Sequence, residues 1–309
     1  MEQFSLYKGD GSTLTQRNAK MQPFRTYTQP NAPAGYVASD ALREAVNVAI
    51  ALGQPLLLTG EPGTGKTQLA FSIAYELELG MPHIFNTKTT STARDLFYRY
   101  DSLAHFRDVQ MKDSSINTDI SKYIYFEALG KAIIESERQR SVVLIDEIDK
   151  APRDLSNDLL NEFENMQFEV KETGKSFKAN KENRPILILT SNSEKNLPDA
   201  FLRRCVYFHI PFPNAAALEE ITRKRLQLSS AFTAQMLNAA ITHFTKIRES
   251  KGLRKPPATA ELLAWVHILD QHNLDVNNIN SPEELKKLMM SYSILAKNKE
   301  DLLKLRSEG

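Results

Sequence analysis

Eight consecutive residues of the chain combine three glycines with a lysine and a threonine. They match the phosphate-binding loop pattern in full: Gly60, Glu61, Pro62, Gly63, Thr64, Gly65, Lys66 and Thr67. The glycines let successive backbone N–H groups turn towards phosphates at the start of a helix, whose dipole favours negative charge. We expect Lys66 to reach the β- and γ-phosphates and the Thr67 hydroxyl to bind Mg²⁺. The loop therefore predicts binding of Mg-ATP.

Two carboxylates end the apolar run from Val142 to Ile145. Asp146 is expected to hold Mg²⁺, directly or through water, and Glu147 to orient and deprotonate the attacking water. A lone Asp-Glu pair is often a solvated turn, but its place at the end of a buried strand favours chemistry. Asn192 follows another apolar run, Ile186 to Leu189, where it could hold the water near the γ-phosphate. By itself, an asparagine after a strand is usually a turn residue.

Short apolar runs and helical patterns alternate along the first two thirds of the chain. The predicted strands are residues 55–59, 83–85, 142–145, 186–189 and 206–210. The predicted helices run from Ser39 or Asp40 to Gly53, from Lys66 to about Leu79, and over 125–139 and 153–165. This alternation predicts an α/β fold with a parallel sheet covered by helices on both faces.

Beyond Pro213 the strand pattern ends, and the length of 309 residues favours two domains. Helical runs occur at about 216–228, 233–249, 259–271 and 282–305. We therefore predict an α/β nucleotide-binding domain over residues 36–213 and an all-α lid domain over 214–309. Residues 1–35 mix Thr, Gln, Asn and Pro without helical periodicity, which predicts an extended N-terminal arm.

Composition and charge narrow the classes of function. Lys and Arg number 39 against 38 Asp and Glu, so no overall field draws the chain to nucleic acid or anionic lipid. The lone cysteine, Cys205, excludes an internal disulfide and a Cys-based zinc cluster, and favours a cytoplasmic location. We expect it to be a small buried hydrophobe and not a reactive thiol. There is no secretory signal and no apolar run of roughly 18 residues, so we expect no membrane association.

Four segments together resemble the AAA+ superfamily of ATPases, and most closely its MoxR-like, dynein-related branch. They read GEPGTGKT, VVLIDEIDKAP, LILTSN and LPDAFLRR, and the similarity covers about residues 36–300. The resemblance implies a five-stranded P-loop domain with a helical lid, assembled into a homo-oligomeric, usually hexameric, ring with ATP between neighbouring subunits. It also implies an arginine that enters the neighbour's site, and the match favours Arg204 over Arg203. Both arginines could equally be surface cations that pair with an acid.

The lid of this family normally contributes another arginine to the phosphates. In this chain the arginine is not at its expected place, so either Arg254 or Lys255 substitutes for it or the contact is absent. Two interruptions, at 87–124 and in a predicted hairpin over 168–178, fall where MoxR-like proteins carry insertions that face the pore. Four aromatic residues of the first could grip a polypeptide or pack a local core, which is the commoner fate: Phe97, Tyr98, Tyr100 and Phe106.

The resemblance implies an ATP-driven remodelling protein or chaperone that acts on a protein partner, in this family often one with a von Willebrand A domain. One alternative is a nucleic-acid motor or nuclease-associated NTPase of McrB-like type. Another is an assembly switch that binds ATP with little turnover. Intact Lys66, Glu147 and Asn192 argue against the switch, and the neutral net charge argues weakly against nucleic acid. We expect the nucleotide base to be contacted by backbone and apolar groups, so the sequence does not show whether the site prefers ATP or GTP.

Overall fold

The computed structural model describes residues 33–110, 119–193, 197–250 and 252–308. The chain divides into two compact units, one spanning Asn31–Phe212 and the other containing Pro213–Gly309. Most of the predicted N-terminal arm, residues 1–32, lies outside the described residues; Pro33–Gly35 form a short 3₁₀ helix. No helix in the described ranges is both long and apolar enough to cross a membrane.

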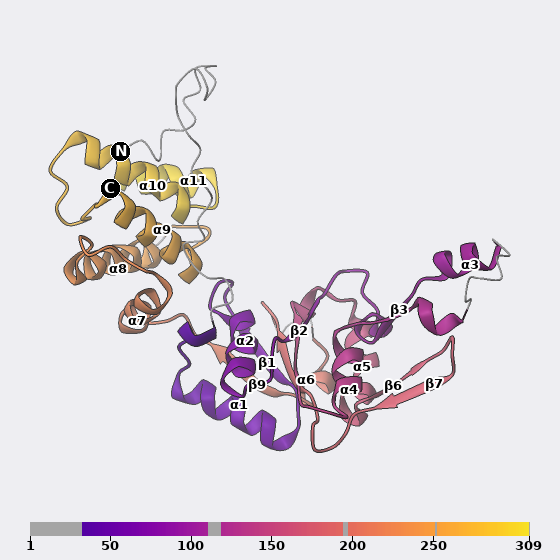
Figure 1. Cartoon of the computed structure of the whole chain (residues 1–309). Coiled ribbons are helices and arrows are strands. Elements are labelled where there is room, and N and C mark those ends of the chain that lie inside the picture. Colours follow the sequence, from indigo (N-terminus) through magenta and orange to yellow (C-terminus); the bar gives the residue numbers. More distant parts are fainter. Residues whose placement is uncertain (1–32, 111–118, 194–196, 251, 309) are drawn as a thin grey trace. The chain divides into compact units, whose positions relative to one another are not determined.

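A five-stranded parallel sheet forms the centre of the first unit, which confirms the predicted α/β fold (Figure 1). Its strand order is β2-β5-β8-β1-β9. The strands are β1 (Leu56–Gly60), β2 (His83–Asn86), β5 (Val142–Asp146), β8 (Ile186–Thr190) and β9 (Val206–Ile210). The three central strands are almost wholly buried, as their uninterrupted apolar sequences predict for a sheet that is covered on both faces.

Helices cover the two faces of this sheet (Figure 1). On one face lie α1 (Asp40–Leu52) and α2 (Lys66–Glu76), which pack on Leu56 and Leu58 of β1. On the other lie α4 (Ala128–Glu135), α5 (Arg153–Asn165) and the short α6 (Asp199–Leu202), which pack on Leu57. Successive strand residues point to opposite faces, so the three central strands β1, β5 and β8 each contribute to both cores.

The first helix begins and ends where its sequence predicts. The Ser39 hydroxyl accepts a hydrogen bond from the Leu42 N–H at 3.2 Å, and Gly53 ends the helix in the left-handed conformation with φ 62°. The predicted helix over 125–139 is shorter than expected, because Ile124–Phe126 form strand β4 and α4 begins only at Ala128.

The two interruptions are ordered where they are described. The first contains η3 (Ala93–Leu96), β3 (Tyr98–Tyr100), α3 (Ser102–Gln110), η4 (Ile120–Tyr123) and β4, and β3 pairs with β4 antiparallel. The second is the predicted hairpin, β6 (Gln167–Val170) and β7 (Lys175–Lys178). Phe97 and Tyr98 are only 4% and 2% exposed and stack on Phe168, so they form a local core. Phe106 on α3 is 62% exposed.

The regular elements among the described residues of the second unit are all helices: α7 (Ala215–Arg225), α8 (Ala234–Glu249), α9 (Thr259–His272), α10 (Pro282–Leu295) and α11 (Lys299–Glu308). Trp265 is fully buried and donates a hydrogen bond to Ser291 at 2.8 Å. The run predicted over 282–305 is two helices. The chain leaves α10 at Ala296, and the side-chain oxygen of Asn298 accepts a hydrogen bond from the Asp301 N–H at 2.8 Å, which starts α11.

Candidate nucleotide site

The glycine-rich loop joins β1 to α2 and has a backbone that requires glycine. Gly60, Gly63 and Gly65 have φ of 144°, 78° and 90°. A Cβ atom on Gly60 would lie 2.6 Å from the carbonyl oxygen of Ile210, too close for any side chain. Lys66 and Thr67 are the first two residues of α2, so the loop presents a helix N-terminus, where backbone N–H groups and the dipole favour an anion.

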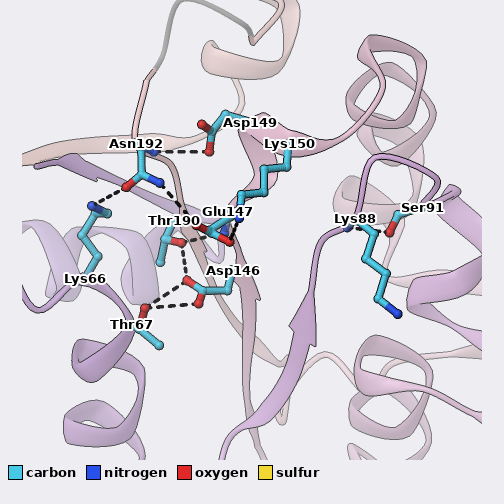
Figure 2. Close-up of polar contacts among 10 residues, drawn as sticks. All are labelled: Lys66, Thr67, Lys88, Ser91, Asp146, Glu147, Asp149, Lys150, Thr190 and Asn192. Carbon is cyan, nitrogen blue, oxygen red and sulfur yellow. Dashed lines mark hydrogen bonds and ion pairs between the residues drawn. The ribbon is translucent and has the colours of Figure 1, made fainter. Parts of the chain in front are cut away.

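Lys66 points back into the loop. Its Nζ donates to the carbonyl oxygens of Gly60 and Glu61, at 2.8 and 2.9 Å. It also donates to Oδ1 of Asn192 at 3.0 Å, the contact that Figure 2 shows. Burial lowers the pKa of the ammonium, while nearby carboxylates, Asp146 foremost, act in the opposite direction. Three hydrogen bonds to oxygen atoms thus hold the ammonium group against the loop and Asn192.

Thr67 and Asp146 lie together at the carboxyl end of β5. The Thr67 hydroxyl donates to the Asp146 carboxylate, at 3.0 Å to Oδ1 and 3.3 Å to Oδ2. A hydroxyl and a carboxylate beside a phosphate loop are the hard oxygen ligands that Mg²⁺ takes in such sites. These two residues therefore fit a magnesium ion, and they are the ones that would hold it.

Glu147 adopts the left-handed conformation, with φ 56°, directly after β5. Its backbone N–H donates to the hydroxyl of Thr190 at 2.9 Å. Its carboxylate pairs with the ammonium of Lys150 and accepts a long hydrogen bond, 3.5 Å, from the side-chain amide of Asn192. Figure 2 shows this group of side chains at one edge of the sheet.

Asn192 links the two sides of the site. Its side chain contacts Lys66 through the oxygen and Glu147 through the nitrogen, while its backbone N–H donates to Oδ1 of Asp149 at 3.2 Å. Sequence reasoning assigned no role to Asp149, Lys150 or Thr190. Asp149 and Lys150 belong to the DEIDK segment and Thr190 to LTSN. The sequence signal that could have identified them is that each lies within a few residues of Glu147 or Asn192.

Arg203 and Arg204 lie away from this group within the chain. They follow α6 and precede β9, at the amino edge of the parallel sheet, whereas Lys66 and the acids lie at the carboxyl edge. Arg204 is half-exposed and lies 3.9 Å from the Glu164 carboxylate. A role for Arg204 at this kind of site consequently requires the site of another subunit.

Arg254 and Lys255 belong to the helical unit, in the segment before α9. The Arg254 guanidinium pairs with Glu300 at 2.8 Å. The backbone N–H groups of both residues donate to the Asp301 carboxylate, at 2.9 and 3.1 Å. The segment is thus tied to the start of α11.

The sheet order, the phosphate loop and the flanking helices define an α/β P-loop fold with a C-terminal helical region. The model of a known family, the AAA domain of the dynein-related subfamily, matches residues 55–205. That segment contains the loop, both acids, Asn192 and both arginines. The match supports an AAA+ ATPase, a class that generally assembles into rings. A search of the curated proteins found no match to the chain.

Proposed function

We propose that the chain binds Mg-ATP at the loop of residues 60–67 and hydrolyses its terminal phosphate. The observation that carries the proposal is the convergence of Lys66, Thr67 and Asp146 with Asn192 at one edge of the sheet, linked by hydrogen bonds of 3.0 to 3.3 Å. Backbone N–H groups of the loop and Lys66 bind the phosphates. Thr67 and Asp146 would hold Mg²⁺, which would supply charge neutralisation at the β- and γ-phosphates.

Glu147 and Asn192 are the residues we assign to the attacking water. The amide of Asn192 holds the water near the γ-phosphate. The Glu147 carboxylate accepts a proton from this water as the water oxygen attacks the γ-phosphorus, while the bond to the bridging oxygen breaks and ADP leaves with that oxygen. The side chains of Glu147 and Asn192 lie within contact, 3.5 Å apart, so one water can reach both. Arg204 of a neighbouring subunit stabilises the charge of the transition state, which is consistent with its distance from its own loop.

At a finer level we propose a MoxR-like ring, hexameric in form, that remodels a protein partner such as one with a von Willebrand A domain. The match to the dynein-related subfamily and the combination of four motifs support this assignment. The single cysteine supports a cytoplasmic location. Hydrolysis would then move the segments around α3 and the β6–β7 hairpin against the partner.

The test compares wild type with Glu147→Gln and Lys66→Ala. We expect Glu147→Gln to reduce ATP turnover by about 10²- to 10⁴-fold while ATP still binds, because the amide keeps the shape of the side chain but takes no proton. Lys66→Ala should lose binding as well. Turnover is followed by phosphate release and binding by a fluorescent ATP analogue, with GTP in parallel.

Two results would contradict the proposal. Glu147→Gln with undiminished turnover would remove Glu147 from the chemistry. If DNA stimulates turnover at low salt and this stimulation is lost at raised salt, the partner is nucleic acid and not a protein.

A further inference from the structure

Thr190 is the last residue of β8 and is 1% exposed. A threonine at a strand end usually packs its methyl group and bonds its hydroxyl to the nearest carbonyl. In this structure the hydroxyl instead contacts two consecutive residues, Asp146 at the end of the neighbouring strand β5 and Glu147 directly after it.

A hydroxyl has one proton to donate and lone pairs to accept with, and both are used. The backbone N–H of Glu147 donates to Thr190 Oγ1 at 2.9 Å. An N–H can only donate, so the hydroxyl proton is free for Asp146, whose Oδ1 it contacts (Figure 2). The directions of both hydrogen bonds are thereby determined.

The parallel register of the sheet brings these groups together. Ile145 of β5 pairs with Leu189 of β8, so the next residues along, Asp146 and Thr190, lie side by side. The Asp146 carboxylate thus accepts hydrogen bonds from two hydroxyl groups, that of Thr67 on α2 and that of Thr190 on β8. Glu147 is in the left-handed conformation, which is unfavourable for a residue with a side chain, and the bond to Thr190 holds its backbone there.

We propose that Thr190 is a positioning residue that couples the metal-binding carboxylate of Asp146 to the backbone of the base Glu147. The inference rests on the proposed ATPase function. Thr190 touches neither water nor phosphate in this role. It orients one oxygen of Asp146 for Mg²⁺ and sets where the Glu147 side chain leaves the main chain, so that loss of one hydroxyl disturbs both metal binding and proton transfer.

The experiment compares Thr190→Val, which replaces the hydroxyl by a methyl group, with Thr190→Ser, which keeps it. Thr59→Val is the matched control, because Thr59 is equally buried in the sheet, 1% exposed, and its hydroxyl contacts Tyr207 and His209 and no acid. Two quantities are measured: the Mg²⁺ concentration for half-maximal binding of a fluorescent ATP analogue, and kcat with KM for ATP.

We expect Thr190→Val to raise the Mg²⁺ requirement about 10-fold and to lower kcat by about 10- to 100-fold, as other supports of metal ligands do. KM at saturating Mg²⁺ should stay within about 3-fold, since the phosphate loop is untouched. Thr190→Ser should restore both quantities, and Thr59→Val should change neither. If the valine variant does not fold, Thr190→Ala repeats the comparison.

An unchanged Mg²⁺ requirement in Thr190→Val would overturn the inference, as would equal losses in Thr59→Val, which would indicate a general weakening of the sheet. The binding measurement needs no turnover. If the wild type binds Mg-ATP but does not hydrolyse it, the proposed hydrolysis fails, and the Mg²⁺ requirement still decides whether Thr190 supports Asp146.

Discussion

The side chains around Glu147 show how much of a site depends on contacts between strands. Its carboxylate lies between the ammonium of Lys150 and the amide of Asn192, and its backbone is held by Thr190. Lys150 is three residues away in the same turn, whereas Thr190 is the last residue of the neighbouring strand β8 and Asn192 lies two residues after it. The proposed base, Glu147, is therefore oriented by contacts from two parts of the chain, and a change in either part alters where its oxygens point.

Cys205 offers a prediction that depends on pH. Burial raises the pKa of its thiol to about 12, and Sγ lies 3.4 Å from the carbonyl oxygen of Phe201. The unfolded thiol ionises near pH 8.5, so at pH 8 the folded chain should hold roughly a thousandfold less thiolate and react correspondingly slowly with a thiol reagent. Above about pH 8.5 the unfolded state loses its proton first, so this group lowers the free energy of unfolding as the pH rises.

The measurement is the rate of reaction with a chromogenic disulfide at pH 8, with and without denaturing urea. A small free thiol serves as the reagent control. Equal rates for Cys205 in the folded and the unfolded chain would show that the thiol is open to solvent, contrary to the packing around it.

At the scale of elements, the small aromatic core beneath the β6–β7 hairpin should contribute strongly to stability. Phe168 stacks on Phe97 and on Phe177, each with ring centroids 5.1 Å apart. Phe168→Ala should lower the free energy of unfolding by about 3 to 5 kcal/mol, through lost burial and the cavity it leaves. Phe106→Ala, at a side chain 62% exposed, should change it by less than about 0.5 kcal/mol.

Urea unfolding, followed by circular dichroism, measures both variants. A loss below about 1 kcal/mol for Phe168→Ala would mean that the hairpin packs only loosely on the domain. A loss for Phe106→Ala as large as that for Phe168→Ala would instead mean that α3 is packed against another part of the protein.

Elements with long, regular patterns were predictable from the sequence, and short ones were not. The three central strands could be predicted because a strand buried on both faces must be apolar throughout, and α1 because Ser39 and Gly53 cap it. The edge strands β2 and β9 were predicted from their short apolar runs, although their residues alternate between partly buried and exposed. Strands β3 and β4 have three residues each, too few for any periodicity. The break between α10 and α11 depends on one asparagine cap inside a continuous helical pattern.

The candidate site also contains residues that the sequence predicts and residues whose role only the fold reveals. The loop and the two acids stand in contiguous motifs whose chemistry can be read along the chain. Thr190 acquires its contacts only from the register between β5 and β8, which is a property of the folded sheet. Asp149 likewise meets Asn192 across two strand ends.

At the scale of the molecule, the two edges of the sheet carry different parts of the proposed machinery. Lys66 and the acids lie at the carboxyl edge, and Arg204 lies at the amino edge. One subunit cannot bring both to a single nucleotide without unfolding the sheet. The two parts meet at one nucleotide if the amino edge of one subunit contacts the carboxyl edge of the next. Such a head-to-tail contact forms a ring where its rotation closes and an open filament where it does not.

This arrangement predicts that two inactive variants restore each other. Glu147→Gln lacks the base but keeps Arg204, and Arg204→Ala lacks the arginine but keeps the base, so each alone should be nearly inactive. In a one-to-one mixture, about a quarter of the subunit interfaces would combine an intact Glu147 with an intact Arg204 of the neighbour. Turnover in the mixture should therefore reach about a quarter of the wild-type value. Phosphate release is measured as a function of total protein concentration, because the subunits must associate before the arginine of one can reach the site of another.

If turnover in the mixture only equals the sum of the two variants, the arginine acts within its own subunit or not at all. If Arg203→Ala is the variant that Glu147→Gln restores, the neighbouring arginine holds the role.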